Sequence, residues 1–148
     1  MKVRNENGTA LVEFAITAPL LFLILFGIIE FGILLYDKAM LTNASREGAR
    51  AGIVFNFSPS GPIRITNDDI AEIVSDYCAS HLISVGGGGA PPATSVARGG
   101  TGAAGDSVTV TVSYQFRFLV ISNLIALIGG DDIADPLTLT AETVMRLE

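Results

Sequence analysis

The chain has 148 residues, of which 49% are hydrophobic and 16% are charged, and its formal net charge is −6. Average globular chains have about a quarter of their residues charged, so this composition favours residence in a membrane. The acidic balance argues against nucleic acid as a partner, because phosphate binding requires clustered lysine and arginine. The single cysteine, Cys78, excludes a disulfide within the chain and leaves one between chains open.

The first long segment predicts a transmembrane helix. Residues 10–29 are predominantly apolar, with Glu13 as their one charged residue, and as a helix they cover about 30 Å, the thickness of the hydrocarbon core of a bilayer. The apolar stretch is too long for a secretory signal peptide, and no small-residue cleavage site follows it. We therefore expect this segment to remain in place as an anchor.

Basic residues on the two sides of the span bear on its orientation. Lys2 and Arg4 precede the span and favour a cytoplasmic N-terminus by the positive-inside rule. Lys38, Arg46 and Arg50 follow it and oppose that assignment. Charge alone therefore leaves the orientation open.

Two carboxylates, one at the outer end of the span and one inside it, differ in their expected roles. Glu30 falls at its outer end, where we expect a boundary residue that reaches the interface. Glu13 lies one turn inside the other end, and a carboxylate costs about 2.5–3.5 kcal/mol at mid-bilayer, less near an edge. Carboxylates inside a span are usually functional and paired, so Glu13 is the candidate for a functional group.

The residues around Glu13 carry a resemblance to a known family. The segment G-T-A-L-V-E-F (8–14) has a glycine, four residues, then a glutamate and an aromatic residue, at the opening of an apolar helix. It is followed by G-I-I-E-F-G (27–32) and by L-T-N-A-S-R-E-G-A-R-A (41–51). Together these segments resemble the TadE-like proteins, which are pseudopilins or minor pilins of the tight-adherence (Flp) type IV pilus system.

The resemblance implies a processing site and a location. A prepilin peptidase would cut between Gly8 and Thr9 on the cytoplasmic side, which makes residues 1–8 a leader. Glu13 and Phe14 would form the processing and assembly motif. The implied location is the bacterial inner membrane, with one span, a cytoplasmic N-terminus and an extracytoplasmic C-terminal domain.

The same resemblance implies partners. These are the prepilin peptidase, other pilin or pseudopilin subunits, the pilus assembly platform and the lipid bilayer, with surface pili as a further location. An alternative function has the same membrane topology but no part in pilus assembly. The chain would then be a bitopic membrane-anchored adaptor of an envelope secretion complex that does not enter a filament.

We expect the N-terminal helix to continue beyond the membrane, over residues 9–52. Ala44, Gly48 and Gly52 recur every four residues and form what we call the small-residue stripe, which permits close approach of another element. The stripe suits packing against another helix and packing against the protein's own domain equally well.

Residues 53–148 predict a small extracytoplasmic α+β domain. Residues 53–65 hold Pro59, Gly61 and Pro62 and predict a connector. Thr66 is a suitable cap for a helix whose apolar residues follow helical spacing as far as Leu82. Residues 86–105 are rich in glycine and predict a flexible loop.

The remaining part predicts two strands. Residues 107–118 and 137–147 both alternate between apolar and polar side chains, and we expect them to pair antiparallel. Residues 119–128 between them are apolar but too short to span a bilayer. They form either a core helix or an exposed patch that docks on the membrane or a partner subunit. The predicted fold class is α+β, with a long N-terminal transmembrane helix, one or two further helices and an antiparallel strand pair.

No catalytic, cofactor or metal site is predicted. The glycines within residues 100–105 fit G-x-G-x-x-G but lack the preceding strand and following helix of a dinucleotide site. His81, the only histidine, has no second ligand at zinc spacing, and we place it on the solvent side or in a capping role. The acids within residues 131–135 predict a solvated turn rather than a calcium loop. We therefore expect a structural protein rather than an enzyme.

Overall fold

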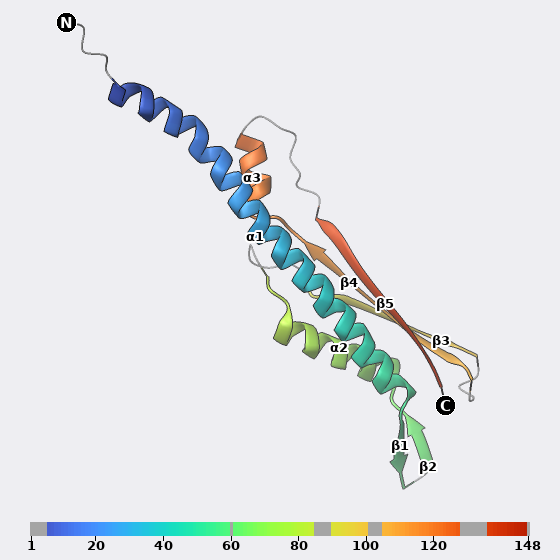
Figure 1. The fold of residues 1–148 in the computed structure, drawn as a ribbon. Coiled ribbons are helices and arrows are strands. Elements are labelled where there is room, and N and C mark those ends of the chain that lie inside the picture. Colours follow the sequence, from blue (N-terminus) through green and yellow to red (C-terminus); the bar gives the residue numbers. More distant parts are fainter. Residues whose placement is uncertain (1–5, 60, 85–89, 101–104, 128–135, 148) are drawn as a thin grey trace, which may run out of the picture.

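The computed structural model describes residues 6–59, 61–84, 90–100, 105–127 and 136–147. Its elements in chain order are α1 (Glu6–Ile53), β1 (Phe55–Ser58), β2 (Gly61–Arg64), α2 (Asn67–His81), β3 (Ala93–Gly99), β4 (Ser107–Phe116), α3 (Val120–Leu127) and β5 (Leu137–Arg146). The fold is α+β as predicted, with a long apolar N-terminal helix followed by a small domain of helices and antiparallel strands (Figure 1).

A three-stranded sheet in the order β3-β4-β5 forms the back of the domain. The predicted antiparallel pair is confirmed, since β4 and β5 pair from Ser107 opposite Arg146 to Phe116 opposite Leu137. Along β4 the buried side chains alternate with partly exposed ones, as the sequence pattern requires for a strand with one face in a core. The buried positions are Val108, Val110, Val112, Tyr114 and Phe116.

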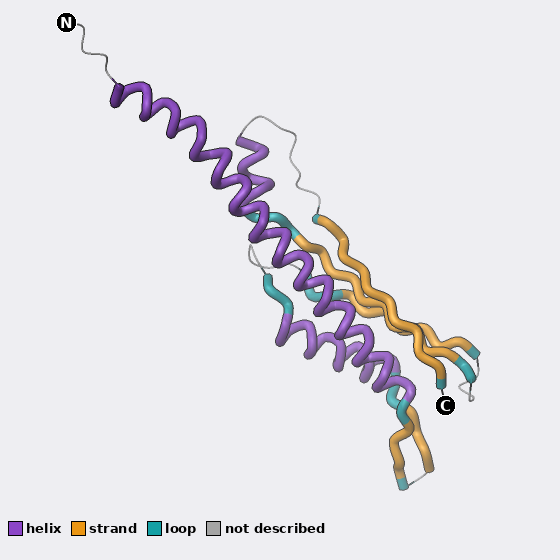
Figure 2. The backbone as a smooth tube through the Cα atoms, in the orientation of Figure 1, coloured by secondary structure: helices purple, strands orange, loops and turns teal. Residues whose placement is uncertain are grey.

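The helices α1 and α2 cover one face of this sheet (Figure 2). α1 packs on β4 and β5, whereas α2 lies beside α1 and contacts β3. The core between them is apolar and almost inaccessible to water, and each buried aliphatic side chain stabilises the fold by about 1.5–3 kcal/mol. Its central members are Leu41, Ile70, Val74, Cys78, Val108, Val110 and Val112.

The helix α2 begins where the sequence predicts. The side chain of Thr66 accepts a hydrogen bond from the amide of Asp69 (3.2 Å), and the Asp69 carboxylate accepts one from the amide of Thr66 (2.8 Å). This reciprocal capping box satisfies two amides that the helix leaves unpaired. The hydrogen bonds from Thr66 also lower the pKa of Asp69.

The single cysteine and the single histidine of the chain, Cys78 and His81, lie near the other end of α2. His81 is exposed as predicted, and its ring stacks on Tyr77 with the centroids 4.3 Å apart. Cys78 is 1% exposed and is therefore a core residue. Burial raises the pKa of the Cys78 thiol, which disfavours the reactive thiolate.

Two predicted loops contain strands. The expected connector over residues 53–65 holds the hairpin β1–β2, in which Phe55 lies opposite Arg64. The side chain of Arg64 lies over the Phe55 ring, 4.2 Å from its centroid. The prolines and glycine that indicated a connector lie at the turn and at the start of β2, where they are compatible with a short two-stranded ribbon.

The expected glycine-rich loop over residues 86–105 is wrong for residues 93–99, which form the edge strand β3. β3 gains its backbone hydrogen bonds from β4 along its whole length. Arg98 of β3 also donates from Nε to the side chain of Asn67 (2.8 Å) and from Nη2 to the carbonyl of Ile65 (2.7 Å). Residues 86–89 and 101–104 of the predicted loop lie outside the described residues.

Candidate assembly and membrane site on the first helix

The helix α1 has two halves with different surroundings. None of the side chains described over residues 8–29, the free half, is buried, and this half projects beyond the domain (Figure 1). From Glu30 onward, in what we call the docked half (residues 30–53), buried positions recur every three or four residues along one side of the helix. They are Glu30, Leu34, Asp37, Leu41, Ala44, Ser45, Gly48, Ala49 and Gly52.

The free half exposes a continuous apolar surface. Leu11, Phe14 and Ile16 are each more than 70% exposed. Among the described residues, α1 is the one helix that is long and apolar enough to cross a membrane. An exposed apolar surface of this extent marks contact with lipid or with other protein, and it fits single-pass membrane anchoring.

The predicted processing site lies at the start of the free half. Gly8 and Thr9 are exposed, and because α1 begins at Glu6, the peptide bond between them lies in its first turns. A side chain at Gly8 would meet no atom within 4 Å. Packing against the described residues therefore does not require a glycine at this position, and its lack of a side chain makes the helix start easier to unwind.

Glu13 is exposed on the same surface. Its backbone carbonyl accepts a hydrogen bond from the hydroxyl of Thr17 (2.8 Å). Its carboxylate forms no ion pair with the residues that the structure describes. A carboxylate on an otherwise apolar helix surface is costly in lipid and needs a partner supplied from outside this part of the chain.

The small-residue stripe faces the protein's own domain. A Cβ atom at Gly48 would lie 2.6 Å from Cγ2 of Val74, and one at Gly52 would lie 2.9 Å from Cδ1 of Ile70. Ala44 is also fully buried. Of the two arrangements that the sequence left open, the structure shows this stripe as the contact surface for α2 and β4.

The side chain of Glu30 does not reach outward to an interface, as the sequence predicts, but is buried within the protein. It is 4% exposed, and its carboxylate accepts hydrogen bonds from the backbone amides of Leu119 (2.8 Å), Val120 (2.5 Å) and Ile121 (3.2 Å). These amides begin α3 and have no partner within that helix. Glu30 thus caps α3 from another element and joins the two helices where the free half of α1 ends.

A second buried acid follows Glu30 at a spacing of seven residues. Asp37 is fully buried, and its Oδ1 atom accepts a hydrogen bond from the amide of Ile83 (3.0 Å). Its Oδ2 atom has no hydrogen-bond partner among the described residues. Burial raises the pKa of Asp37 above its ordinary value, and the bond from Ile83 offsets part of that effect.

Further polar contacts hold the docked half to β5. The hydroxyl groups of Ser45 and Thr143 lie 2.7 Å apart, and Lys38 donates a hydrogen bond to the carbonyl of Thr140. Glu30 contacts the start of α3, and Asp37 contacts Ile83 after α2. Together with the contacts to β5, polar groups along α1 therefore hold three segments of the domain. These bonds fix the rotation of α1 about its own axis, and hence which side of the free half faces outward.

Comparison with known families bears on this helix. Residues 8–50 match the family model described as TadE-like protein. Residues 8–50 are TadE-like. The resemblance read from the sequence is thereby confirmed over residues 8–50. A search of curated proteins and a search of solved structures each gave no match.

The TadE-like segment contains most of the features described above. It includes the exposed glycine and glutamate of the free half, both buried acids and the first two residues of the small-residue stripe. It ends within α1, before α2 and the sheet. The family match therefore covers the anchoring helix and the surface by which that helix holds its domain.

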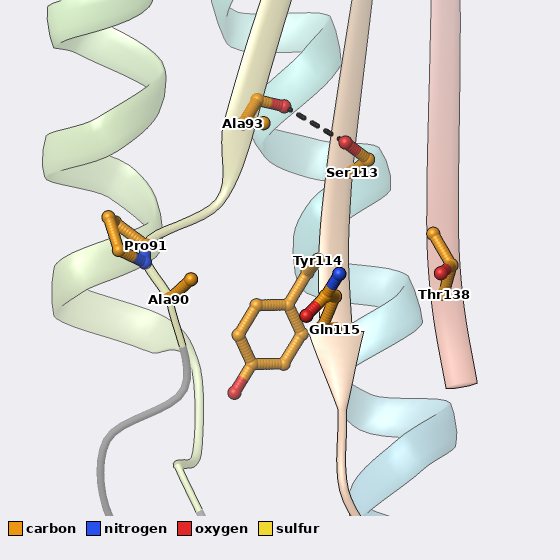
Figure 3. Close-up of a pocket in the computed structure, with 7 residues that line it drawn as sticks. All are labelled: Ala90, Pro91, Ala93, Ser113, Tyr114, Gln115 and Thr138. Carbon is orange, nitrogen blue, oxygen red and sulfur yellow. Dashed lines mark hydrogen bonds between the residues drawn. The ribbon is translucent and has the colours of Figure 1, made fainter. Parts of the chain in front are cut away.

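The sheet also carries a small pocket. Its volume is about 150 Å³, and Tyr114 points toward the segment of Ala90 and Pro91 (Figure 3). At its upper edge the hydroxyl of Ser113 donates to the carbonyl of Ala93 (3.4 Å), which joins β4 to β3. The described lining offers hydroxyl and amide groups but no carboxylate, imidazole or thiol, which is a poor set for acid–base chemistry.

Metal-ligating side chains are scattered in the part of the chain that the structure describes. No group of three or more His, Cys, Asp or Glu side chains is close enough there to hold an ion. The acids of the predicted solvated turn, Asp131, Asp132 and Asp135, lie outside the described residues.

Proposed function

We propose that the protein is a structural pseudopilin or minor pilin of a tight-adherence pilus and acts without catalysis. A prepilin peptidase removes residues 1–8, and the free half of α1 then packs beside the helices of other subunits and of the assembly platform. The N-terminus lies in the cytoplasm, and the domain of residues 53–148 lies outside the inner membrane.

One observation carries this proposal. The free half of α1 exposes its apolar side chains and the Glu13 carboxylate together, while the docked half packs against the domain along one side. A simple anchor needs only the apolar surface, because lipid makes no use of a carboxylate. A subunit that is first stored in the membrane and later packed against neighbours has a use for both.

The chemistry of processing supplies a partner for Glu13. Cleavage after Gly8 creates an amine at Thr9, which lies about 6 Å from Glu13 along the axis of the same helix. The amine of a neighbouring subunit is the alternative partner. Pairing between subunits lowers the cost of both charges and fixes the axial register of the two helices.

Mass spectrometry of the N-terminus tests the processing step. We expect the mature chain to begin at Thr9, and we expect Gly8→Val to block cleavage without blocking membrane insertion. Gly27→Val is a matched control, since a side chain at Gly27 also meets nothing within 4 Å, and it should leave cleavage unchanged. A chain that still begins at Met1 in cells with an active prepilin peptidase would favour the membrane-anchored adaptor instead.

Glu13→Val tests the assembly step. The substitution removes a charge from the apolar surface, so the chain should insert and be cut, yet pilus formation or incorporation into pili should fall. Glu47→Val is the control, because Glu47 is an exposed glutamate on the docked half of the same helix. Normal piliation by the Glu13 variant would show that Glu13 does not set the register between subunits.

A further inference from the structure

We infer that two copies of this protein, anchored side by side in one membrane, associate through the outer surfaces of α1 and α2. Arg46 and Arg50 of α1 form what we call the basic patch, and Glu72 and Asp76 of α2 form the acidic patch. The basic patch of one copy contacts the acidic patch of the second copy. The inference rests on the anchoring of α1 in a bilayer and is independent of the proposed cleavage and of any filament.

The accessibility of the two patches is the first argument. Each residue of the basic patch is two positions from Gly48, and each residue of the acidic patch is two positions from Val74, both of which are buried. Two positions correspond to about 200° around a helix, so both patches point away from the core. All of their side chains are exposed, and none forms an ion pair with the residues that the structure describes.

The height of the patches along α1 is the second argument. In one chain α2 lies beside α1 (Figure 2), and the two helices are antiparallel, since Val74 lies against Gly48 whereas Ile70 lies against Gly52. Two residues to either side of the contact between Gly48 and Val74, the two patches therefore occupy the same heights. The residues at equal height are Arg46 with Asp76 and Arg50 with Glu72.

The membrane makes this equality of height decisive for the choice of partner. Two copies that are anchored in one bilayer with the same orientation are related by a rotation about the membrane normal or by a displacement within the plane. Either operation keeps every residue at its own height, so the basic patch of one copy meets the acidic patch of the other without an axial shift. The chain is therefore complementary to itself in charge, which identifies the partner as a second copy.

Apolar side chains extend the same surface toward the membrane. Tyr36 of α1 is 41% exposed and Ile83, just after α2, is 43% exposed. The hydrogen bond from the amide of Ile83 to Asp37 places these two side chains at one height as well. Ion pairs between exposed side chains are individually weak, but anchoring in one bilayer removes part of the translational and rotational cost of association. A contact of modest size is therefore sufficient for copies that share a membrane.

Disulfide cross-linking of the full-length protein in phosphatidylcholine liposomes tests the inference. One chain carries Arg46→Cys and a second, differently tagged chain carries Asp76→Cys, so a product with both tags forms only between chains. The native Cys78 is 1% exposed and stays in place. The control is Arg50→Cys mixed with Ser80→Cys, two exposed positions that differ in height by about 12 Å. We expect the 46–76 product to exceed the 50–80 product several-fold and to decrease as salt screens the charges.

A charge exchange at the neighbouring pair separates specific pairing from random collision. Arg50→Glu, added to the chain with the cysteine at 46, should lower the yield of the 46–76 product several-fold. Glu72→Arg, added to the other chain, should restore it, because the exchanged charges attract again. Glu142→Arg makes the same change in net charge at an exposed position of β5 and should not restore it.

Equal yields for the two cysteine pairs, or a failure of Glu72→Arg to restore the product, would overturn the inference. The liposomes contain neither a prepilin peptidase nor other pilus components. The result is therefore independent of the proposed cleavage and of assembly into a pilus.

Discussion

Gly48 is the position at which a single methyl group should damage the domain most clearly. In Gly48→Ala the new Cβ would lie 2.6 Å from Cγ2 of Val74, 3.3 Å from Cγ2 of Ile70 and 3.4 Å from Cγ1 of Val110. Carbon atoms in contact prefer separations of about 3.5–4.0 Å. All three neighbours are β-branched side chains, whose stiff χ1 angles prevent easy withdrawal.

The size of the effect follows from two opposing terms. Overpacking of a well-filled core costs about 1–3 kcal/mol. Replacement of glycine by alanine inside a helix stabilises the folded state by about 1 kcal/mol, because the unfolded backbone loses less entropy on folding. Since the contact with Val74 is much too short and rigid, we expect a net loss of about 1–2 kcal/mol in the free energy of unfolding.

Pulsed maleimide labelling of Cys78 across a urea series, on the full-length protein in nanodiscs, measures this loss. The thiol is buried in the same core, so it reacts only when the domain opens. In the absence of urea, labelling should be about five- to thirtyfold faster than in the wild type if opening and closing are rapid. The control is Gly32→Ala, because a side chain at Gly32 meets nothing within 4 Å and should not destabilise the domain.

A double-mutant cycle distinguishes the clash from any other effect. Val74→Ala removes the methyl group that the new Cβ meets, so Gly48→Ala should cost less in the Val74→Ala background than in the wild type. The expected coupling exceeds about 0.5 kcal/mol. Additive losses, or equal behaviour of Gly48→Ala and Gly32→Ala, would refute the reasoning.

Two further predictions concern Asp37 and Cys78. Burial raises the pKa of Asp37 above 3.8, so its contribution to stability is fully present below that pH and is lost as the pH rises through the raised pKa. Asp37→Asn should therefore gain stability relative to the wild type from acid toward neutral pH, and parallel urea midpoints across that range would contradict this. Cys78 should react with a membrane-impermeant maleimide from the periplasmic side after mild unfolding, whereas labelling only after lysis of the inner membrane would reverse the proposed orientation.

The strands and helices with strong periodic patterns could be predicted from the sequence. Residues 107–116 alternate without interruption, and Thr66 supplies a side-chain cap, so β4 and α2 appear almost where expected. β3 was missed because its sequence, A-T-S-V-A-R-G, consists of small and polar residues. This edge strand is held by the backbone of β4 and by the contacts of Arg98, and Val96 is its one large apolar side chain packed against the core.

The candidate site could be predicted only in part. The exposed glycine and glutamate at the start of α1 were found because their spacing forms a family motif. The role of Glu30 was missed, although a signal was present. Glu30, Asp37 and Ala44 are spaced by seven residues, as are Leu34, Leu41 and Gly48, and that spacing places them on one side of a helix. What the sequence did not indicate is that the amides of residues 119–121, which are far away in the chain, lie against this side.

The position of Glu30 explains why the apolar stretch of α1 is longer than a membrane requires. Beyond Glu30 the sequence continues F-G-I-L-L-Y, and there Leu34 turns toward the domain while Phe31 and Leu35 remain about half exposed. Hydropathy alone cannot separate a helix surface that meets lipid from one that meets its own core. The change occurs where a carboxylate becomes buried, and a buried charge is stable only when several hydrogen-bond donors face it. Because those donors are backbone amides, substitutions within residues 119–121 preserve the cap as long as the backbone keeps its path, whereas a substitution at Glu30 removes it.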